Sequence, residues 1–369
     1  MRQNGLLSGI RVLDLSRVLA GPLSAMILGD LGADVIKAER KGSGDETRGW
    51  GPPFDSRGES AYFLSCNRNK KSVAVDLDDP QDVTFLRALA ADADVVIENF
   101  RRGALERRGV HAEELLARHQ RLIWCTITGF GADSDRPGYD FVVQAELGWM
   151  AISGPAEGPP TKSGVALVDV IAGKDTAIAV LAALVARDRG TLDRRLFISL
   201  ADSARAALVN VAQNALVTGR DATRWGNAHP NLVPYQLFDA EDRPVVLAVG
   251  SDSQWTACTR ALGLDDLATD QALLTNAGRL ADRARVVRSI ADRVRSRPAA
   301  HWLEALERAG VPCGRVRTVL EALEGSGADS LFGVPPSVPG SMRLPPPRLN
   351  EHGLAIRSQG WRVFAEGTQ

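Results

Sequence analysis

The sequence predicts an α/β protein with two domains, the larger of which is built on a parallel β-sheet. Through the first part of the chain, short apolar runs rich in Val and Ile alternate with longer helical segments, as in βαβ units. From about residue 220 the pattern changes to a Pro-bounded pair of strands and short helices. The 369 residues also exceed the usual size of a single core. We therefore expect a large Rossmann-like domain at 1–215, completed by 320–369, and a small α+β domain at 220–315.

The first two expected strands enclose a helix. Residues 10–16, "IRVLDLS", form a short apolar run that ends in polar residues. Residues 21–32 have the character of a helix and close on Gly32, a residue type that commonly ends helices. Residues 33–39 form the next apolar run and predict the second strand.

The next segments keep this alternation. Residues 71–77 predict a third strand, and residues 79–93 predict a helix with Asp79 as its N-cap and Pro80 in its first turn. Further strands are expected at 94–100, 121–130 and in the segment that starts at residue 194, each followed by polar or helical sequence.

Ligands of a parallel sheet bind at the carboxyl ends of its strands. The first strand lacks the GxGxxG turn of a dinucleotide site and continues instead as "SRVLAGP". The candidate ligand-binding residues at the strand ends are Arg17 to Gly21, Glu39 with Arg40, Asn99 with Phe100, and Gly129 with Phe130.

The second half of the chain holds the small domain and a C-terminal arm. "NLVPYQLFDAEDRPVVLAVG" predicts a hairpin-like pair of strands, and short helices follow it. The segment at 335–353 is rich in Pro and Gly but keeps regular apolar spacing, which favours an extended arm lying over a surface.

Composition excludes several classes of function. The net charge of −1 predicts no nucleic-acid partner, and no apolar run approaches the length of a membrane span. The N-terminus does not have the layout of a signal peptide. Four widely spaced cysteines without a CxxC motif, and five scattered histidines, predict reduced thiols, no metal site and a cytoplasmic protein.

Asp169 is the one charge in an apolar run that precedes a long helical segment rich in Ala, Leu and Val. One interpretation is a helix N-cap or a buried carboxylate paired with an Arg. The alternative uses the same location, because a dry carboxylate beside a helix N-terminus stays ionised and can act as a nucleophile. Gly164 and Gly173 on either side are expected to let a bulky ligand approach the backbone.

Motifs along the whole chain decide between these interpretations. In order, they are "GIRVLDLSRVLAGPLSAMILGDLGADVIKAERKGSGDETRGWGPPF", "NRNKKSVAVDL", "VVIENFRRGALERRGV", "ITGFG", "RPGYDFVVQAELGWM", "VALVDVIAGKDTAIAVLAALVAR", "HPNLVPYQLF", "AGVPCGRV" and "LNEHG". This ordered set closely resembles the family III CoA-transferases of the CaiB/BaiF superfamily.

The resemblance implies an enzyme that moves CoA between an acyl-CoA donor and a small carboxylic acid, with CoA as substrate and no tightly bound cofactor. In such enzymes a catalytic aspartate attacks the thioester, forms a mixed anhydride, and is converted by the released thiolate to an aspartyl-CoA thioester. Asp169 matches that aspartate within "VALVDVIAG". The resemblance also implies an obligate homodimer of interlocked chains, whose sites lie between the large domain of one chain and the small domain of the other.

The CoA contacts implied by the resemblance fall on strand ends. They are Val18, Leu19, Ala20, Arg40, Asn99, Phe100 and Arg107. Arg suits phosphate because its planar fork bonds two oxygens. Leu19 stands where formyl-CoA transferases have Gln, and Asp78 and Pro137 stand where relatives have Lys, so these contacts differ here.

The residues implied for the substrate pocket are Trp50, Tyr139, Asp140 and His229. Trp50 is equally compatible with a core position, and His229 with a structural role beside Pro230.

Two other functions compete with CoA transfer. An α-methylacyl-CoA racemase of the same superfamily pairs the aspartate with a His, but Tyr139 occupies that point, and a phenol with a pKa of about 10 is a poor base at neutral pH. A non-catalytic CoA-binding paralogue is the second, and the intact "VDVIAG" argues against it.

Overall fold

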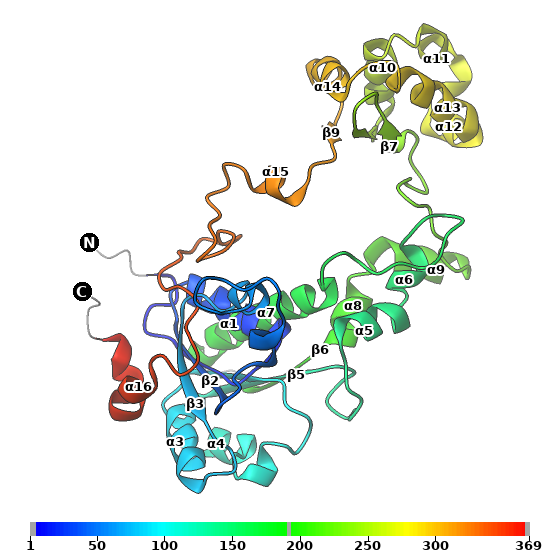
Figure 1. Ribbon diagram of the computed structural model, residues 1–369. Coiled ribbons are helices and arrows are strands. Elements are labelled where there is room, and N and C mark those ends of the chain that lie inside the picture. The colour runs from blue at the N-terminus through cyan, green and yellow to red at the C-terminus, as the bar shows by residue number, and fades with distance from the viewer. Residues whose placement is uncertain (1–4, 190–192, 366–369) are drawn as a thin grey trace. The chain divides into compact units, whose positions relative to one another are not determined.

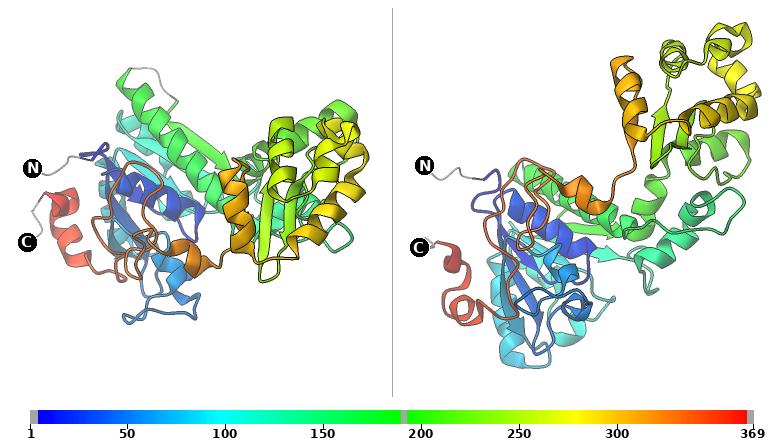
Figure 2. Two further views of the ribbon diagram at one scale, coloured as in Figure 1. Left: turned by 90° about the horizontal axis from the view of Figure 1, so that it is seen from above. Right: turned by 45° about the horizontal axis from the view of Figure 1, so that its top comes forward.

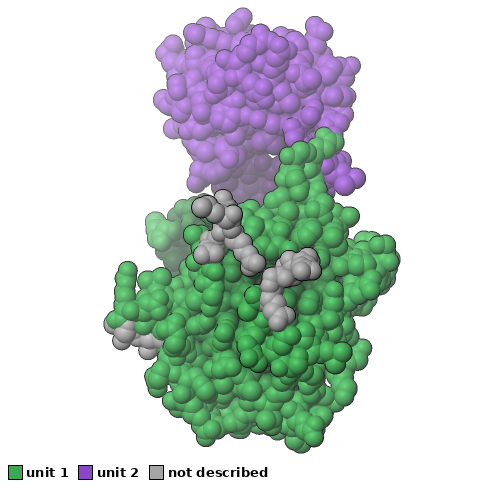
Figure 3. Space-filling view, turned by 90° about the vertical axis from the view of Figure 1, so that its left-hand side faces the viewer, with its two compact units in different colours: residues 1–150, 162–220, 323–369 green, residues 151–161, 221–322 purple. Residues whose placement is uncertain are grey.

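The computed structural model describes residues 5–189 and 193–365 (Figure 1). The chain forms two compact units, which Figure 3 colours green and purple. Unit 1 comprises residues 1–150, 162–220 and 323–369, and unit 2 comprises 151–161 and 221–322. Residues 151–161 cluster with the smaller unit, whereas the sequence predicts that they belong to the large domain.

Unit 1 is built on a six-stranded sheet in which every pair of neighbouring strands is parallel. Its order is β3-β2-β1-β4-β5-β6. The strands are β1 (Arg11–Asp14), β2 (Asp34–Arg40), β3 (Lys70–Val75), β4 (Val95–Glu98), β5 (Ile123–Thr128) and β6 (Arg195–Ser199). This confirms the parallel sheet that the sequence predicts. The strand order reverses between β1 and β4, and a crevice opens at such a switch point.

Helices cover both faces of this sheet (Figures 1 and 2). One face packs against α1 (Ala20–Asp30), α7 (Leu167–Asp188) and α8 (Leu200–Ala206). The other packs against α3 (Pro80–Ala91) and α4 (Ala112–Arg118). Alternate residues of β1, β2, β4 and β5 enter different cores, which explains the continuous apolar runs in the sequence.

Local sequence explains the helix ends of unit 1. Asp79 accepts a hydrogen bond from Gln81 N–H and Pro80 opens α3, so the predicted cap is confirmed. The helical segment after β6 is divided into α8 and α9 (Val209–Thr218), because the backbone of Val209 has a φ of +42°.

The shorter elements of unit 1 connect the strands and helices described above. They are η1 (Glu46–Gly49), α2 (Ala61–Leu64), η2 (Glu106–Arg108), α5 (Asp140–Glu146), α6 (Trp149–Ile152), α16 (Gly353–Gln359) and η4 (Gly360–Phe364). The last two residues of α6 belong to unit 2.

Unit 2 has its own core beside a three-stranded antiparallel sheet, which confirms the predicted strand pair. The sheet consists of β7 (Tyr235–Asp239), β8 (Pro244–Ala248) and β9 (Cys313–Arg315). The helices are α10 (Asp252–Ala261), α11 (Asp265–Thr269), η3 (Gln271–Leu273), α12 (Asn276–Ala281), α13 (Arg283–Val294), α14 (Ala299–Arg308) and α15 (Val319–Leu323), whose last residue falls in unit 1. Trp255 and Trp302 are buried at its centre.

The C-terminal arm returns to unit 1 and runs over its surface, as the sequence predicts. Arg68 donates to Phe332 O and Val334 O, and Arg343 donates to Gly29 O and Ala33 O. Arg68 thus binds the backbone of the arm, and Arg343 of the arm binds the backbone around α1, so hydrogen bonds in both directions fix its extended course.

Gly173 lets α1 and α7 approach closely. A Cβ at this position would lie 2.7 Å from Ala20 O and 3.3 Å from the Leu23 side chain. The expectation that Gly173 leaves room for a ligand is therefore wrong, since the space is filled by α1. A Cβ at Gly164 would meet open space.

We expect Gly173→Ala to destabilise the protein by roughly 1–3 kcal/mol, although Ala is the better helix former. The close neighbour is a backbone oxygen, so the two helices must separate. Thermal unfolding measures the effect, with Lys174→Ala on the exposed side of α7 as the matched control. A melting temperature equal to that of the control variant would contradict this account of the contact.

Candidate functional site

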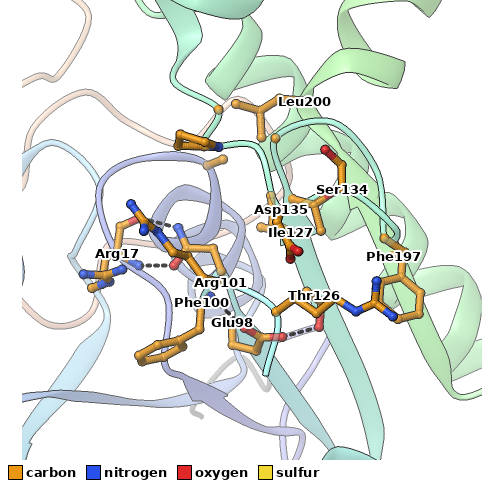
Figure 4. A pocket seen from close by; sticks show the side chains of 18 of the residues that line it. Arg17, Glu98, Phe100, Arg101, Thr126, Ile127, Ser134, Asp135, Phe197 and Leu200 are labelled. Atoms are coloured by element: carbon orange, nitrogen blue, oxygen red, sulfur yellow. Dashed lines mark hydrogen bonds between the residues drawn. The ribbon is translucent and has the colours of Figure 1, made fainter. Parts of the chain in front are cut away.

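A cavity of about 420 Å³ lies at the carboxyl ends of β1, β4 and β5 and extends over the sheet towards β6 (Figure 4). The turns that follow β1, β4 and β5 line it, as does the first turn of α7. This is the switch point of the sheet, where the strand order predicts a ligand site.

The turn after β1 is held in a strained conformation. Val18 has a φ of +71°, which is costly for a β-branched residue. Its N–H donates to Asp45 Oδ1 at 3.3 Å. One residue earlier, Arg17 N–H donates to Asn99 Oδ1 at 2.9 Å, and Asn99 Nδ2 donates to Arg17 O at 2.8 Å. The side chain of Asn99 therefore holds the turn after β1 through both of its polar atoms.

Buried charges support this turn from below. Lys37 Nζ donates to Ser16 O at 2.8 Å and lies 3.0 Å from Asp45 Oδ2. Lys70 Nζ lies 2.8 Å from Asp14 Oδ2. Burial acts to raise the pKa of Asp14, but the ammonium groups of Lys37 and Lys70 outweigh it and lower that pKa overall.

Asp169 is the third residue of α7, and its carboxylate lines the cavity. The residue is only 8% exposed, and no described residue donates a hydrogen bond to its carboxylate. Burial, and then the nearby Asp140 carboxylate, raise the pKa of Asp169 to about 7. Desolvation and this like charge both oppose the ionisation that the helix N-terminus was expected to favour.

Asp140, the first residue of α5, caps α7. Its Oδ2 accepts the N–H groups of Val168 at 2.8 Å and Asp169 at 3.4 Å. Gln144 Nε2 donates to Asp140 Oδ1 at 2.6 Å, and Gln144 Oε1 accepts Ser163 N–H at 2.9 Å. Asp140 thus supplies the helix cap that one interpretation of the sequence gave to Asp169 itself.

Arginines border the cavity. They are Arg17, Arg101, Arg102, Arg136 and Arg195. Arg136 follows the cavity rim beside Pro137, where it stacks on the Phe130 ring at 4.1 Å and pairs with Glu146 at 2.6 Å. Guanidinium groups at a strand-end cavity suit a ligand that carries phosphate or carboxylate groups.

Several residues predicted for the site lie together here. The cavity is lined by Val18, Leu19, Ala20, Asn99, Phe100, Tyr139 and Asp169. Arg40 at the end of β2 and Arg107 in η2 are exposed and do not line it.

Trp50 is half exposed and does not line the cavity, and its ring meets the Tyr62 ring edge-on at 5.1 Å. Burial, and then the charge of Asp169, raise the pKa of the Tyr62 phenol to about 12. Tyr62 is not predicted from the sequence, because a lone Tyr in "SAYFLS" carries no local signal of its distance to Asp169.

His229 belongs to unit 2. Its ring lies 5.2 Å from that of Tyr235, and its Nδ1 accepts the N–H of Asn231 at 3.0 Å. These contacts give His229 a structural role within its own unit.

The described residues contain no group of His, Cys, Asp and Glu side chains arranged to hold a metal ion. Within the described ranges, no helix has both the length and the apolar character needed to cross a bilayer. The four cysteines are free thiols.

Comparisons with known proteins agree with the motifs. The family model "CoA-transferase family III" matches residues 7–330. Succinyl-CoA:glutarate CoA-transferase of Mus musculus is 42% identical over 318 residues, which are 85% of this chain and 72% of the mouse protein. Succinate–glutarate CoA-transferase of Agrobacterium fabrum is 40% identical over 323 residues, 85% of this chain and 81% of the relative.

A crystal structure of a CAIB/BAIF family protein from Brucella suis superposes with a TM-score of 0.87 at 38% identity and covers 97% of this chain and 100% of that one. The chain therefore belongs to CoA-transferase family III and is an enzyme that transfers coenzyme A from an acyl-CoA to a carboxylic acid.

Proposed function

We propose that Asp169 is the nucleophile of CoA transfer and that the strand-end cavity binds the acyl-CoA. The observation that carries this is a buried carboxylate without a hydrogen-bond donor among the described residues, facing a cavity bordered by arginines. A poorly solvated carboxylate whose lone pairs are free is more reactive than one tied into an ion pair.

The proposed steps exchange acyl and thiol groups without net consumption of protons. Asp169 Oδ attacks the thioester carbon of the donor, the C–S bond breaks, and CoA leaves as the thiolate. The thiolate then attacks Cγ of the mixed anhydride, which releases the donor acid and leaves an aspartyl-CoA thioester. The acceptor carboxylate attacks the same Cγ, the C–S bond breaks, and CoA leaves again as the thiolate. The thiolate then attacks the acceptor's carbonyl carbon in the new mixed anhydride, which forms the new acyl-CoA and releases the Asp169 carboxylate.

The backbone of the first turn, Val18 to Ala20, is proposed to contact the pantetheine part of CoA. Arginines at the cavity rim, among them Arg136, are proposed to bind its phosphates. Arg40 and Arg107 remain proposals for the more distant phosphate, since both are exposed. Tyr139 and Asp140 are proposed to border the acyl group, and Trp50 and His229 remain weaker proposals for the same pocket.

The acids are proposed to be small dicarboxylates. The mouse and Agrobacterium relatives are named for succinyl-CoA or succinate with glutarate, which makes succinyl-CoA and glutarate the first pair to assay. α-Deuterium uptake by a 2-methylacyl-CoA in deuterated water, without an added acid, would instead favour the racemase.

Asp169→Asn is expected to lower the transfer of CoA from succinyl-CoA to glutarate at least about a thousandfold, because an amide does not attack the thioester. In the wild type, hydroxylamine should trap the activated aspartyl group as a hydroxamate at residue 169, detectable by mass spectrometry. Asp175→Asn, further along α7, is the control and should keep both properties. An Asp169→Asn variant with undiminished transfer would refute the assignment.

The rate should rise with pH through about 7 and level off above it, because the nucleophile must be deprotonated. Asp140→Asn removes the negative charge that helps to raise the pKa of Asp169, while its amide oxygen still accepts Val168 N–H. The acidic limb of kcat/KM should therefore move to lower pH. The pH profiles of wild type, Asp140→Asn and Asp175→Asn measure this, and a limb unmoved relative to the control would contradict the coupling.

We also propose an interlocked homodimer with sites between the large domain of one chain and the small domain of the other. Apolar side chains on the surface of unit 1 support a partner chain, among them Leu216 at 79% and Val217 at 75% exposed on α9. Sedimentation is expected to give twice the mass of 39.5 kDa at nanomolar concentration. Stable folded monomers on dilution would argue against an obligate dimer.

A further inference from the structure

Glu98, the last residue of β4, is a buried acid on the floor of the cavity that the proposed chemistry leaves unused. It is 5% exposed, and its carboxylate forms no ion pair with a described cation, because Arg195 reaches it only through a hydroxyl. Burying a carboxylate without a cation costs free energy, so the hydrogen bonds that compensate for this cost indicate what the residue does.

Both carboxylate oxygens of Glu98 are committed. Oε2 accepts the N–H of Phe100 at 2.8 Å, and Oε1 accepts the hydroxyl of Thr126 on the neighbouring strand β5. Arg195 on β6 donates to the same hydroxyl at 2.8 Å. Figure 4 shows Glu98 joined to Thr126 by a dashed line, with the Phe100 ring to one side. A polar chain thus crosses three strands and ends on the backbone of the turn after β4.

The turn after β4 also holds the turn after β1. Asn99 lies between Glu98 and Phe100 and binds both the N–H and the carbonyl of Arg17. The Arg17 guanidinium lies 5.3 Å from the centre of the Phe100 ring. The two turns that face each other across the switch point are therefore one connected assembly, anchored at Glu98.

We propose that Glu98 is a positioning residue for acyl-CoA: it sets the Asn99–Phe100 turn and, through it, the Arg17–Ala20 turn. This inference rests on the proposed binding of acyl-CoA in the cavity. Glu98 does not touch the reacting atoms, so its loss should weaken the binding of CoA more than it slows the chemical steps.

The test compares Glu98→Leu and Glu98→Gln with Asp82→Leu as the matched control. Gln can accept Phe100 N–H and donate to Thr126 Oγ1, so it keeps the assembly without the charge. Asp82 is also buried and accepts a backbone N–H, that of Asp76 at 2.7 Å, but it does not line the cavity.

Glu98→Leu should raise the Kd of CoA, measured by calorimetry, and the KM of the acyl-CoA about tenfold or more, with kcat within about threefold. Glu98→Gln should restore both to near the wild-type values. Asp82→Leu should lower the melting temperature without changing either. If Glu98→Leu matches its control in CoA binding, or if Gln is no better than Leu, the inference is overturned.

Thr126→Val provides a second test should Glu98→Leu not fold. It removes the hydroxyl that orients the carboxylate and leaves Glu98 in place, so a smaller rise in the Kd of CoA, about threefold, is expected. An unchanged Kd would count against the positioning role.

A wild type that transfers no CoA and binds none would overturn the proposed function itself, whereas an active wild type with insensitive variants would overturn only the role of Glu98.

Discussion

The pairing of buried charges under the turn after β1 is the constraint on which the site depends. Asp14, Lys37 and Lys70 stand on the three adjacent strands β1, β2 and β3 and are almost completely buried. Removing one of them would leave a partner charge unpaired in the interior, which is far more costly than losing a surface pair. The pairing therefore admits essentially one arrangement of the strand ends and of the turn above them.

This fixed arrangement carries the strain of the turn. Lys37 donates to Ser16 O and forms an ion pair with Asp45. Asp45 in turn accepts the N–H of Val18, whose backbone is in the left-handed conformation. Such a conformation persists only where its surroundings determine it from several sides. From this turn α1 starts, and Gly173 allows it to lie directly against α7, so the packing that supports the turn also shields Asp169 from water.

The two parts of the cavity differ in charge. Arginines border it and suit anionic groups, whereas the carboxylates of Asp169 and Asp140 at the start of α7 are buried and poorly solvated. Asp140 has two effects on α7: one carboxylate oxygen caps the helix, and the negative charge helps to raise the pKa of Asp169. Burial and the Asp140 charge together raise the pKa of Asp169, so the protonation state of this carboxylate depends on its immediate environment.

The sequence by itself determined the parallel sheet, the Asp79 cap of α3 and the unusual charge at Asp169, and it predicted the strand ends at which the cavity lies. These features follow from local periodicity, turn chemistry and motif order. Only the tertiary structure decided that Asp140 caps α7, that Gly173 admits a helix and not a ligand, and that Asn99 and Glu98 serve the turns. Each of these depends on contacts between residues far apart in the chain. Burial and long-range charge pairing exist only after folding, and so the pKa of Asp169 could not be predicted from its neighbours in sequence.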